Sequence, residues 1–303
     1  MATHKASEEE KEVLEKYLLQ FMNLEKRYPL LPGINNTGAM AGLMGLDEEE
    51  FTKLRDRFKE NAKEAALELL KEDKVAEWLD DLPFEKGDTI VALGDSLTDD
   101  LQGWFNIFEH VVDITVPEAD FNFVNAGLSY DTSTDALKRL NRDVLVHEPD
   151  WVIIALGTFD AQKLHVEPNR PLVSLADYWE NLNTIEAAVK EHTENPLVWI
   201  TPPPVITEML EEIRLFNFDI YEEDLQNIRE ILSGKQGYIV DPMGTRMSNE
   251  DEVEAWNYLS DGLHPSISGH VNTVRELIRH LTQTKDPEKG AQLEKPEDLQ
   301  QED

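Results

Sequence analysis

The spacing of apolar residues divides the chain into two parts near residue 84. Before that point apolar residues recur every three or four positions, as in amphipathic helices, and no run resembles a strand. Ser7 and Glu10 form a capping-box pattern that predicts a first helix ending before Pro29, and Asp47 precedes a second helix that continues to Leu70. We therefore expect residues 1–84 to be a helical extension whose apolar stripes pack on another part of the molecule.

Between these two helices lies the glycine-rich segment INNTGAMAGLMG. It has no GK[ST] sequence, so it does not fit a phosphate-binding loop. The segment predicts a turn and a short helix, and the alternative is a mobile lid over an active site.

From residue 85 the period changes to short β-rich runs that alternate with helical patterns. The predicted strands are Thr89–Leu93, Phe121–Asn125, Trp151–Leu156, Leu197–Thr201 and Tyr238–Val240. Helices are predicted near 97–110, 132–147, 174–192, 206–233 and 266–282. Alternating βα units with continuously apolar strands predict an α/β fold, in which helices cover both faces of a parallel sheet, over residues 85–283. Residues 284–303 lose this periodicity, so we expect an acidic, disordered tail.

Composition excludes several classes of partner and cofactor. With 62 acidic against 28 Lys and Arg residues the formal net charge is -34, which would repel nucleic acid and anionic membrane surfaces. This acidity indicates either adaptation to high salt or a contribution to solubility alone. The chain has no cysteine, hence no thiolate nucleophile and no disulfide. There is neither a secretory pattern nor a long apolar run, so we expect a soluble cytoplasmic protein.

The first candidate for chemistry is Ser96, in the sequence TIVALGDSLTDD. It follows the first predicted parallel strand and begins the next helix, which is where open α/β sheets place their sites. Backbone N–H groups at that helix start can stabilise an oxyanion. We expect Gly94 to allow the tight turn and Asp95 to brace it.

A second candidate is the sequence SDGLHPS, in which Asp261 precedes His264 by three residues. A serine hydroxyl needs an imidazole to accept its proton, and the imidazole needs a carboxylate to fix its tautomer. The loop supplies both groups, and Pro265 would stiffen it. The alternative is that Asp261 caps a turn and His264 lies on the surface.

Together these motifs resemble the GDSL/SGNH hydrolase family over about residues 86–283. GDSL occupies Gly94 to Leu97, VNAGLSYDTS supplies the glycine block with Gly127, and DGLHPS is the last block. The resemblance implies a flavodoxin-like sheet of order 2-1-3-4-5. It also implies a triad of Ser96, His264 and Asp261, and an oxyanion hole formed by the N–H groups of Ser96 and Gly127. Residues 1–84 lie outside the resemblance.

One block departs from the family pattern. The family's GxND reads GTFD here, so Phe159 replaces the asparagine whose side chain donates to the oxyanion. We expect an incomplete oxyanion hole, unless another group replaces this donor. Asn125 is a candidate because strand alternation points it the same way as Gly127, although it could equally cap the strand end.

Other features carry less chemistry. We interpret the apolar residues that follow Ser96 at helical spacing as core rather than as an acyl pocket: Leu101, Trp104, Phe105, Phe108 and Val112. The remaining histidines that we considered show no metal-ligand spacing and are expected at the surface or at helix ends: His110, His147, His165, His192, His270 and His280. The proline run Pro202–Pro204 either shapes a pocket rim or ends a strand. We expect no metal and no cofactor.

The sequence thus predicts hydrolysis of a small-molecule carboxylic ester through an acyl-enzyme on Ser96. The acyl group is expected to be short, such as an acetyl group on a carbohydrate. The alternatives are a thioesterase or lysophospholipase with the same triad, and a binding or regulatory protein that has lost efficient catalysis.

Overall fold

The computed structural model describes residues 5–212, 217–242, 255–284 and 287. Its main sheet has five parallel strands in the order β2-β1-β3-β5-β7. The strands are β1 (Thr89–Gly94), β2 (Asn122–Gly127), β3 (Trp151–Ala155), β5 (Val198–Ile200) and β7 (Tyr238–Val240). Counted along the chain this is the expected order 2-1-3-4-5, so the predicted sheet is confirmed.

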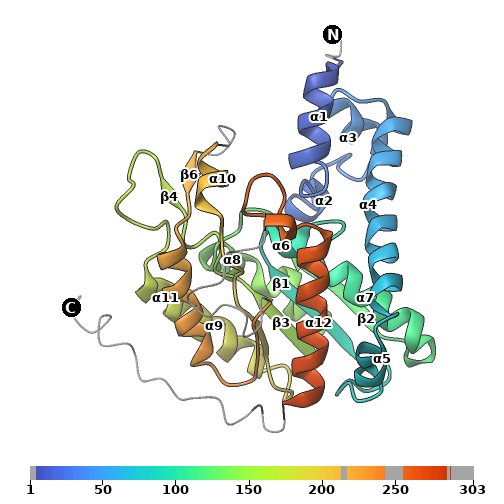
Figure 1. Ribbon diagram of the computed structural model, residues 1–303, viewed down its shortest axis with the longest axis vertical. Helices are drawn as coiled ribbons and strands as arrows, with labels where there is room; N and C mark the ends of the chain where they lie inside the picture. Colours follow the sequence, from blue (N-terminus) through green and yellow to red (C-terminus); the bar gives the residue numbers. More distant parts are fainter. Residues whose placement is uncertain (1–4, 213–216, 243–254, 285–286, 288–303) are drawn as a thin grey trace.

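Helices cover both faces of the sheet (Figure 1). On one face α7 (Trp104–Thr115) and α12 (Ile267–Gln283) pack on side chains such as Ile90 and Ile153. On the other face lie α8 (Ser133–Asp143), α9 (Leu175–Lys190) and α11 (Glu222–Ser233), over side chains such as Val91 and Ile154. Successive residues of a strand thus point to opposite faces of the sheet, and each face has its own hydrophobic core. The continuously apolar strands predict this arrangement. The α/β fold with helices on both faces is confirmed.

The helical extension is also observed. It contains α1 (Glu8–Tyr17), α2 (Leu24–Arg27), α3 (Thr37–Leu43), α4 (Glu48–Leu69) and α5 (Asp73–Leu79). The capping box of Ser7 and Glu10 is present, and the Asp47 side chain caps α4. The carboxyl-terminal half of α4 packs on α7, where Ala62, Ala66 and Leu69 join the core of the sheet. The predicted packing of the extension is therefore confirmed.

Three predicted helices are interrupted in the structure. The first ends at Tyr17, and the chain then runs irregularly to the short helix α2. The helix predicted near 97–110 divides into α6 (Ser96–Asp99) and α7, because the chain turns between Asp100 and Gly103. The helix predicted at 206–233 divides into α10 (Thr207–Glu212) and α11, with strand β6 (Phe218–Asp219) between them.

The remaining elements are small. Strand β6 pairs antiparallel with β4 (Lys163–Leu164) in a separate two-stranded sheet. Within the described ranges, 3-10 turns lie at Pro117–Ala119, Leu145–His147 and Ala255–Asn257. The predicted disordered tail falls almost wholly outside the described residues. Within the described part of the chain, no helix is long and apolar enough to cross a membrane.

Candidate active site

Ser96 lies where β1 turns into α6, at the carboxyl end of the central strands. Asp95 caps this helix, and its Oδ1 accepts a hydrogen bond of 3.0 Å from the Leu97 N–H. A Cβ on Gly94 would lie 2.1 Å from the Thr98 Oγ1, so only glycine allows the turn to fold this tightly. The predicted roles of Asp95 and Gly94 are thus confirmed. The Ser96 side chain is buried.

The loop before α12 holds the side chains of His264 and Asp261 in contact with each other. The His264 Nδ1 and the Asp261 Oδ2 are 2.8 Å apart, and both side chains are buried. The other oxygen, Asp261 Oδ1, accepts the backbone N–H groups of Leu263 and His264 at 3.0 and 2.9 Å. Burial raises the pKa of Asp261, but the charge and hydrogen bond of His264 outweigh that effect and lower it below the usual range. Asp261 is therefore held as a carboxylate beside the imidazole.

Gly262 shapes this loop. Its φ is +65°, and a Cβ there would lie 2.6 Å from the carbonyl oxygen of Ile206. A side chain would be both strained and in collision. The glycine between Asp261 and His264 therefore lets the loop pack closely enough to hold the pair.

The backbone amide that reaches the Ser96 hydroxyl belongs to Tyr130. Its N–H donates a hydrogen bond of 2.9 Å to the Ser96 Oγ. Tyr130 has a φ of +64°, an uncommon conformation for a residue with a side chain. This residue could not be identified from the sequence, because a left-handed backbone conformation is usually signalled by glycine or asparagine and not by tyrosine. It gives the site an N–H donor beside the Ser96 hydroxyl.

Gly127 and Asn125 hydrogen-bond to each other at the end of β2, which fits the strand-end role that was one of the two expectations for Asn125. The Gly127 N–H donates to the Asn125 Oδ1 at 3.0 Å, and the Asn125 Nδ2 donates to the Thr98 carbonyl at 2.8 Å. A Cβ on Gly127 would lie 2.6 Å from the Asp99 amide nitrogen, so glycine is needed for the approach of β2 to α6. In this structure both residues brace the turn around Ser96, and the amide beside the nucleophile is that of Tyr130.

Phe159 replaces the asparagine of the family pattern, and its side chain packs in the core beside the site. Its side chain is fully buried. Its ring makes edge-to-face contacts with Tyr130 and Phe218, with centroids 5.3 and 6.1 Å away, and lies 6.2 Å from the ring of His264. The adjacent Asp160 accepts hydrogen bonds from the backbone and hydroxyl of Ser133. The altered block therefore has a structural role in this chain.

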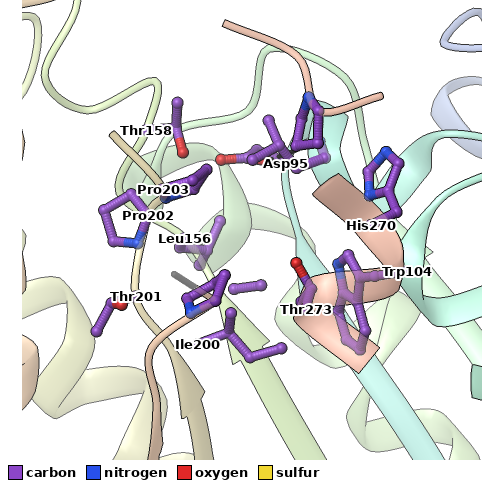
Figure 2. A pocket seen from close by; sticks show the side chains of 14 residues that line it. Asp95, Trp104, Leu156, Thr158, Ile200, Thr201, Pro202, Pro203, His270 and Thr273 are labelled. Carbon is purple, nitrogen blue, oxygen red and sulfur yellow. Dashed lines mark hydrogen bonds between the residues drawn. The ribbon is translucent and has the colours of Figure 1, made fainter. Parts of the chain in front are cut away.

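Behind the nucleophile turn lies a cavity of about 20 Å³, large enough for one water molecule (Figure 2). Asp95 and Thr158 lie at one end of it, and Pro202 and Pro203 line one side. The prolines line this small cavity just after the end of β5, so the strand-end expectation for them fits the structure. Burial raises the pKa of Asp95 to about 7, and the charge of Asp160 contributes to the rise.

His270 also lines this cavity. It lies in the first turn of α12, in line with the helix-end expectation, but its side chain is fully buried and not at the surface. Its Nε2 lies 3.1 Å from the Oδ2 of Asp100, which is also buried. The residue lies on the face of α12 that packs against the sheet. Its contact with Asp100, which is distant in the sequence, could not be predicted from the local pattern.

The irregular segment between α1 and α2 reaches into the site. The ring of Phe21 lies on the imidazole of His264, with centroids 4.3 Å apart. Lys26 donates hydrogen bonds of 2.6 Å to the Asp99 Oδ1 and 2.8 Å to the Gly127 carbonyl. Asn23 donates to the Asp99 carbonyl and carboxylate, both at 2.8 Å. Figure 1 shows α2 beside α6, so the extension lies against the nucleophile turn.

No metal centre accompanies these residues. Among the residues that the structure describes, no group of three or more histidine, aspartate or glutamate side chains is arranged to hold an ion. The candidate site holds the groups that acyl-transfer chemistry uses: the Ser96 hydroxyl with a backbone N–H donor beside it, and the buried His264–Asp261 pair.

The parallel α/β fold and these groups are those expected of a carboxylic ester hydrolase. Residues 92–271 match the model of the GDSL-like lipase/acylhydrolase family. The chain belongs to that family, and the predicted family and enzyme class are confirmed.

Similar proteins agree with this family. The acetylxylan esterase of Geobacillus stearothermophilus is 24% identical over 211 residues, which cover 64% of this chain and 94% of that protein. The uncharacterized lipoprotein YqeF of Bacillus subtilis (strain 168) is 31% identical over 127 residues, or 39% of this chain and 49% of that protein.

Solved structures show the same fold. The acetylxylan esterase Axe2 of Geobacillus stearothermophilus superposes with a TM-score of 0.51 and 21% identity, covering 65% of this chain and 95% of that one. A lipase/acylhydrolase of Enterococcus faecalis gives a TM-score of 0.50 and 23% identity, covering 66% of this chain and 98% of that one.

Proposed function

We propose that this esterase works through a covalent acyl-enzyme on Ser96. The observation that carries the proposal is the buried His264–Asp261 pair, with 2.8 Å between the Nδ1 and the Oδ2, on the loop that shares this end of the sheet with Ser96. Asp261 fixes the imidazole tautomer with the proton on Nδ1, which leaves Nε2 as the base. Removal of the Ser96 proton by that nitrogen makes the hydroxyl a competent nucleophile.

In the first half-reaction Ser96 Oγ bonds to the ester carbonyl carbon while its proton moves to His264. The negative charge on the carbonyl oxygen is stabilised by backbone N–H groups, for which Ser96 and Tyr130 are the best placed. Collapse of this intermediate breaks the bond to the alcohol, which leaves with the proton from His264. In the second half-reaction water repeats these steps, releasing the acid and restoring Ser96.

For the substrate we propose small carboxylic esters, with an acetyl group on a carbohydrate as the first to test. Support comes from the relative named as an acetylxylan esterase. In that relative, replacements of a serine, an aspartate and a histidine by alanine are described as catalytic mutants, and its aspartate and histidine are three positions apart, like Asp261 and His264.

A fluorophosphonate probe tests the nucleophile. After incubation with the full chain, peptide mapping is expected to place the adduct on Ser96, and Ser96→Ala is expected to remove it. Ser233→Ala, an exposed serine at the end of α11, is the matched control and should label as wild type does. An adduct on another residue would assign the nucleophile to that residue, and the absence of any adduct would contradict an acyl-enzyme mechanism.

A further inference from the structure

A cavity of about 310 Å³ lies between the N-terminal extension and the turn that follows β2. Residues 17–18, 21–24 and Arg27 form one wall, and residues 128–131 with Asp99 and Asp135 form the other. Its volume is at the lower end of the range for small-molecule sites. The family resemblance does not cover the first wall, so this cavity is a feature of the extension.

Two residues that line the cavity also contact the proposed catalytic residues. Phe21, which lines it, lies on the ring of His264 at 4.3 Å between centroids. Tyr130, which also lines it, donates its backbone N–H to the Ser96 Oγ. A group bound in the cavity would therefore lie next to an ester held at Ser96.

Hydrogen bonds fix the wall that the extension supplies. The Leu101 N–H donates to the Gln20 carbonyl at 3.0 Å, and the Gln102 side chain donates to that of Gln20 at 2.6 Å. The Ser129 hydroxyl donates to the Phe21 carbonyl at 2.6 Å. Such bonds hold the wall in place without any ligand, as expected of a pre-formed site.

The charged groups of the cavity are paired. Asp99 is bound by Lys26, Asp131 by Arg27 and Arg139, and Asp135 by Lys138. The other lining side chains are mostly apolar: Tyr17, Leu18, Phe21, Met22, Leu24, Leu128 and Tyr130. A lining with compensated charges and apolar walls favours an uncharged apolar group over a charged one.

We propose that this cavity is a subsite for an uncharged apolar chain in those esters that carry one, so that the N-terminal extension sets the chain-length preference among them. The proposal rests on ester hydrolysis at Ser96. An apolar chain on either side of the scissile carbonyl has the same chemistry, so the experiment separates the acyl from the alcohol side.

The test compares long with short esters in the full chain. One pair is p-nitrophenyl octanoate and acetate, which varies the acyl side, and the other is octyl and ethyl acetate, which varies the alcohol side. Met22→Trp fills the cavity from a half-buried position. It is expected to lower the long-to-short ratio of kcat/KM by about tenfold or more in one pair, since one methylene in an apolar pocket already changes specificity by about that factor. Leu31→Trp, at an exposed position outside the cavity lining, is the control and should leave both ratios unchanged.

Two outcomes would overturn the subsite: ratios unchanged within about twofold in both pairs, or the same fall in Leu31→Trp. Calorimetric titration of 1-octanol into Ser96→Ala protein gives a readout without catalysis. Binding that Met22→Trp weakens supports the subsite even if the proposed mechanism fails, and an absence of binding overturns it even if esters are hydrolysed at Ser96. Leu18→Trp provides a second filling variant should Met22→Trp not fold.

Discussion

The ring of Phe21 covers the imidazole of His264, with 4.3 Å between centroids and 38° between ring planes. The two residues come from opposite ends of the chain, one from the helical extension and the other from the loop before α12. Both side chains are buried. The extension therefore supplies part of the surroundings of His264, the proposed general base, and the candidate active site includes residues from both parts of the chain.

The triad assignment predicts that its members act as one unit. Ser96→Ala and His264→Ala are each expected to lower kcat on p-nitrophenyl acetate by about 10⁴-fold or more, and Asp261→Asn by a comparable or smaller factor. Steady-state kinetics of the three variants and of Ser233→Ala would measure this. A Ser96→Ala enzyme within about threefold of wild type would remove Ser96 from the mechanism.

Phe159 offers a second prediction, because the structure changes the expectation for it. The sequence favoured an incomplete oxyanion hole that an asparagine would complete, whereas the buried ring packs on Tyr130 and Phe218. Phe159→Asn should open a cavity and bury an amide, so we expect the free energy of unfolding to fall by about 3 kcal/mol without a gain in turnover.

Urea denaturation and ester kinetics together check this prediction. Phe159→Leu, which remains apolar, is the control and should lose less stability. A stable Phe159→Asn enzyme with higher turnover on short esters would restore the original view of an incomplete hole.

Much of the fold could be predicted from the sequence. The continuous apolar runs of the strands and the helical stripes between them correspond to the five parallel strands and the two layers of helices. The sequence did not predict the interruptions within the helices. Between α1 and α2, for example, the helical spacing of apolar residues continues through Leu18 and Phe21 although the helix has ended. These side chains remain apolar because they face the cavity and His264, so periodicity alone could not reveal that the helix had ended.

The site was predictable only where a motif carried it. Ser96 and the Asp261–His264 pair stand in recognisable local sequences, whereas Tyr130, Phe21 and Lys26 reach the site through the tertiary fold. Gly127 illustrates the limit, because its position in the motif was right but its contacts were not foreseen. Its role depends on how closely β2 approaches α6, which is a distance in space and not along the chain.

The buried carboxyl of Asp95 predicts a pH dependence of stability. Burial raises the pKa of Asp95 from 3.8 to about 7 in the folded protein, whereas an unfolded aspartate titrates near its ordinary value. Between these values the folded state holds a proton that the unfolded state has released. This contribution to stability is therefore full below about pH 4 and is lost as the pH rises towards 7.

Asp95→Asn should reduce this loss, because the amide oxygen can still accept the Leu97 N–H but the group no longer ionises. We expect the free energy of unfolding of the variant to fall less than that of wild type between about pH 4.5 and 7.5, measured by urea denaturation. Asp56→Asn, at an exposed position, is the control and should follow wild type. Equal slopes in Asp95→Asn and wild type would contradict the prediction.

The ion pair of Lys26 and Asp99 joins the extension to the helix of the nucleophile, with 2.6 Å between the Nζ and the Oδ1. The Asp99 side chain is only 2% exposed, so removing the lysine charge would leave a buried carboxylate without its cation. Lys26→Met is therefore expected to lower the free energy of unfolding by about 3 kcal/mol. Lys11→Met, which breaks a more exposed pair with Glu50, is the control and should lose much less stability.

A double-mutant cycle separates this pairing from general damage to the extension. With Asp99→Asn in place, loss of the lysine no longer leaves a buried carboxylate without a cation. The double variant Lys26→Met/Asp99→Asn should therefore be more stable than the sum of the two single effects predicts. Because Asp99 shares α6 with Ser96, we also expect Lys26→Met to lower kcat on p-nitrophenyl acetate and the second substitution to restore part of it. Strictly additive losses of stability would show that Lys26 contributes through its contacts with Asn125 and Gly127, and that the ion pair itself does not couple the extension to the nucleophile.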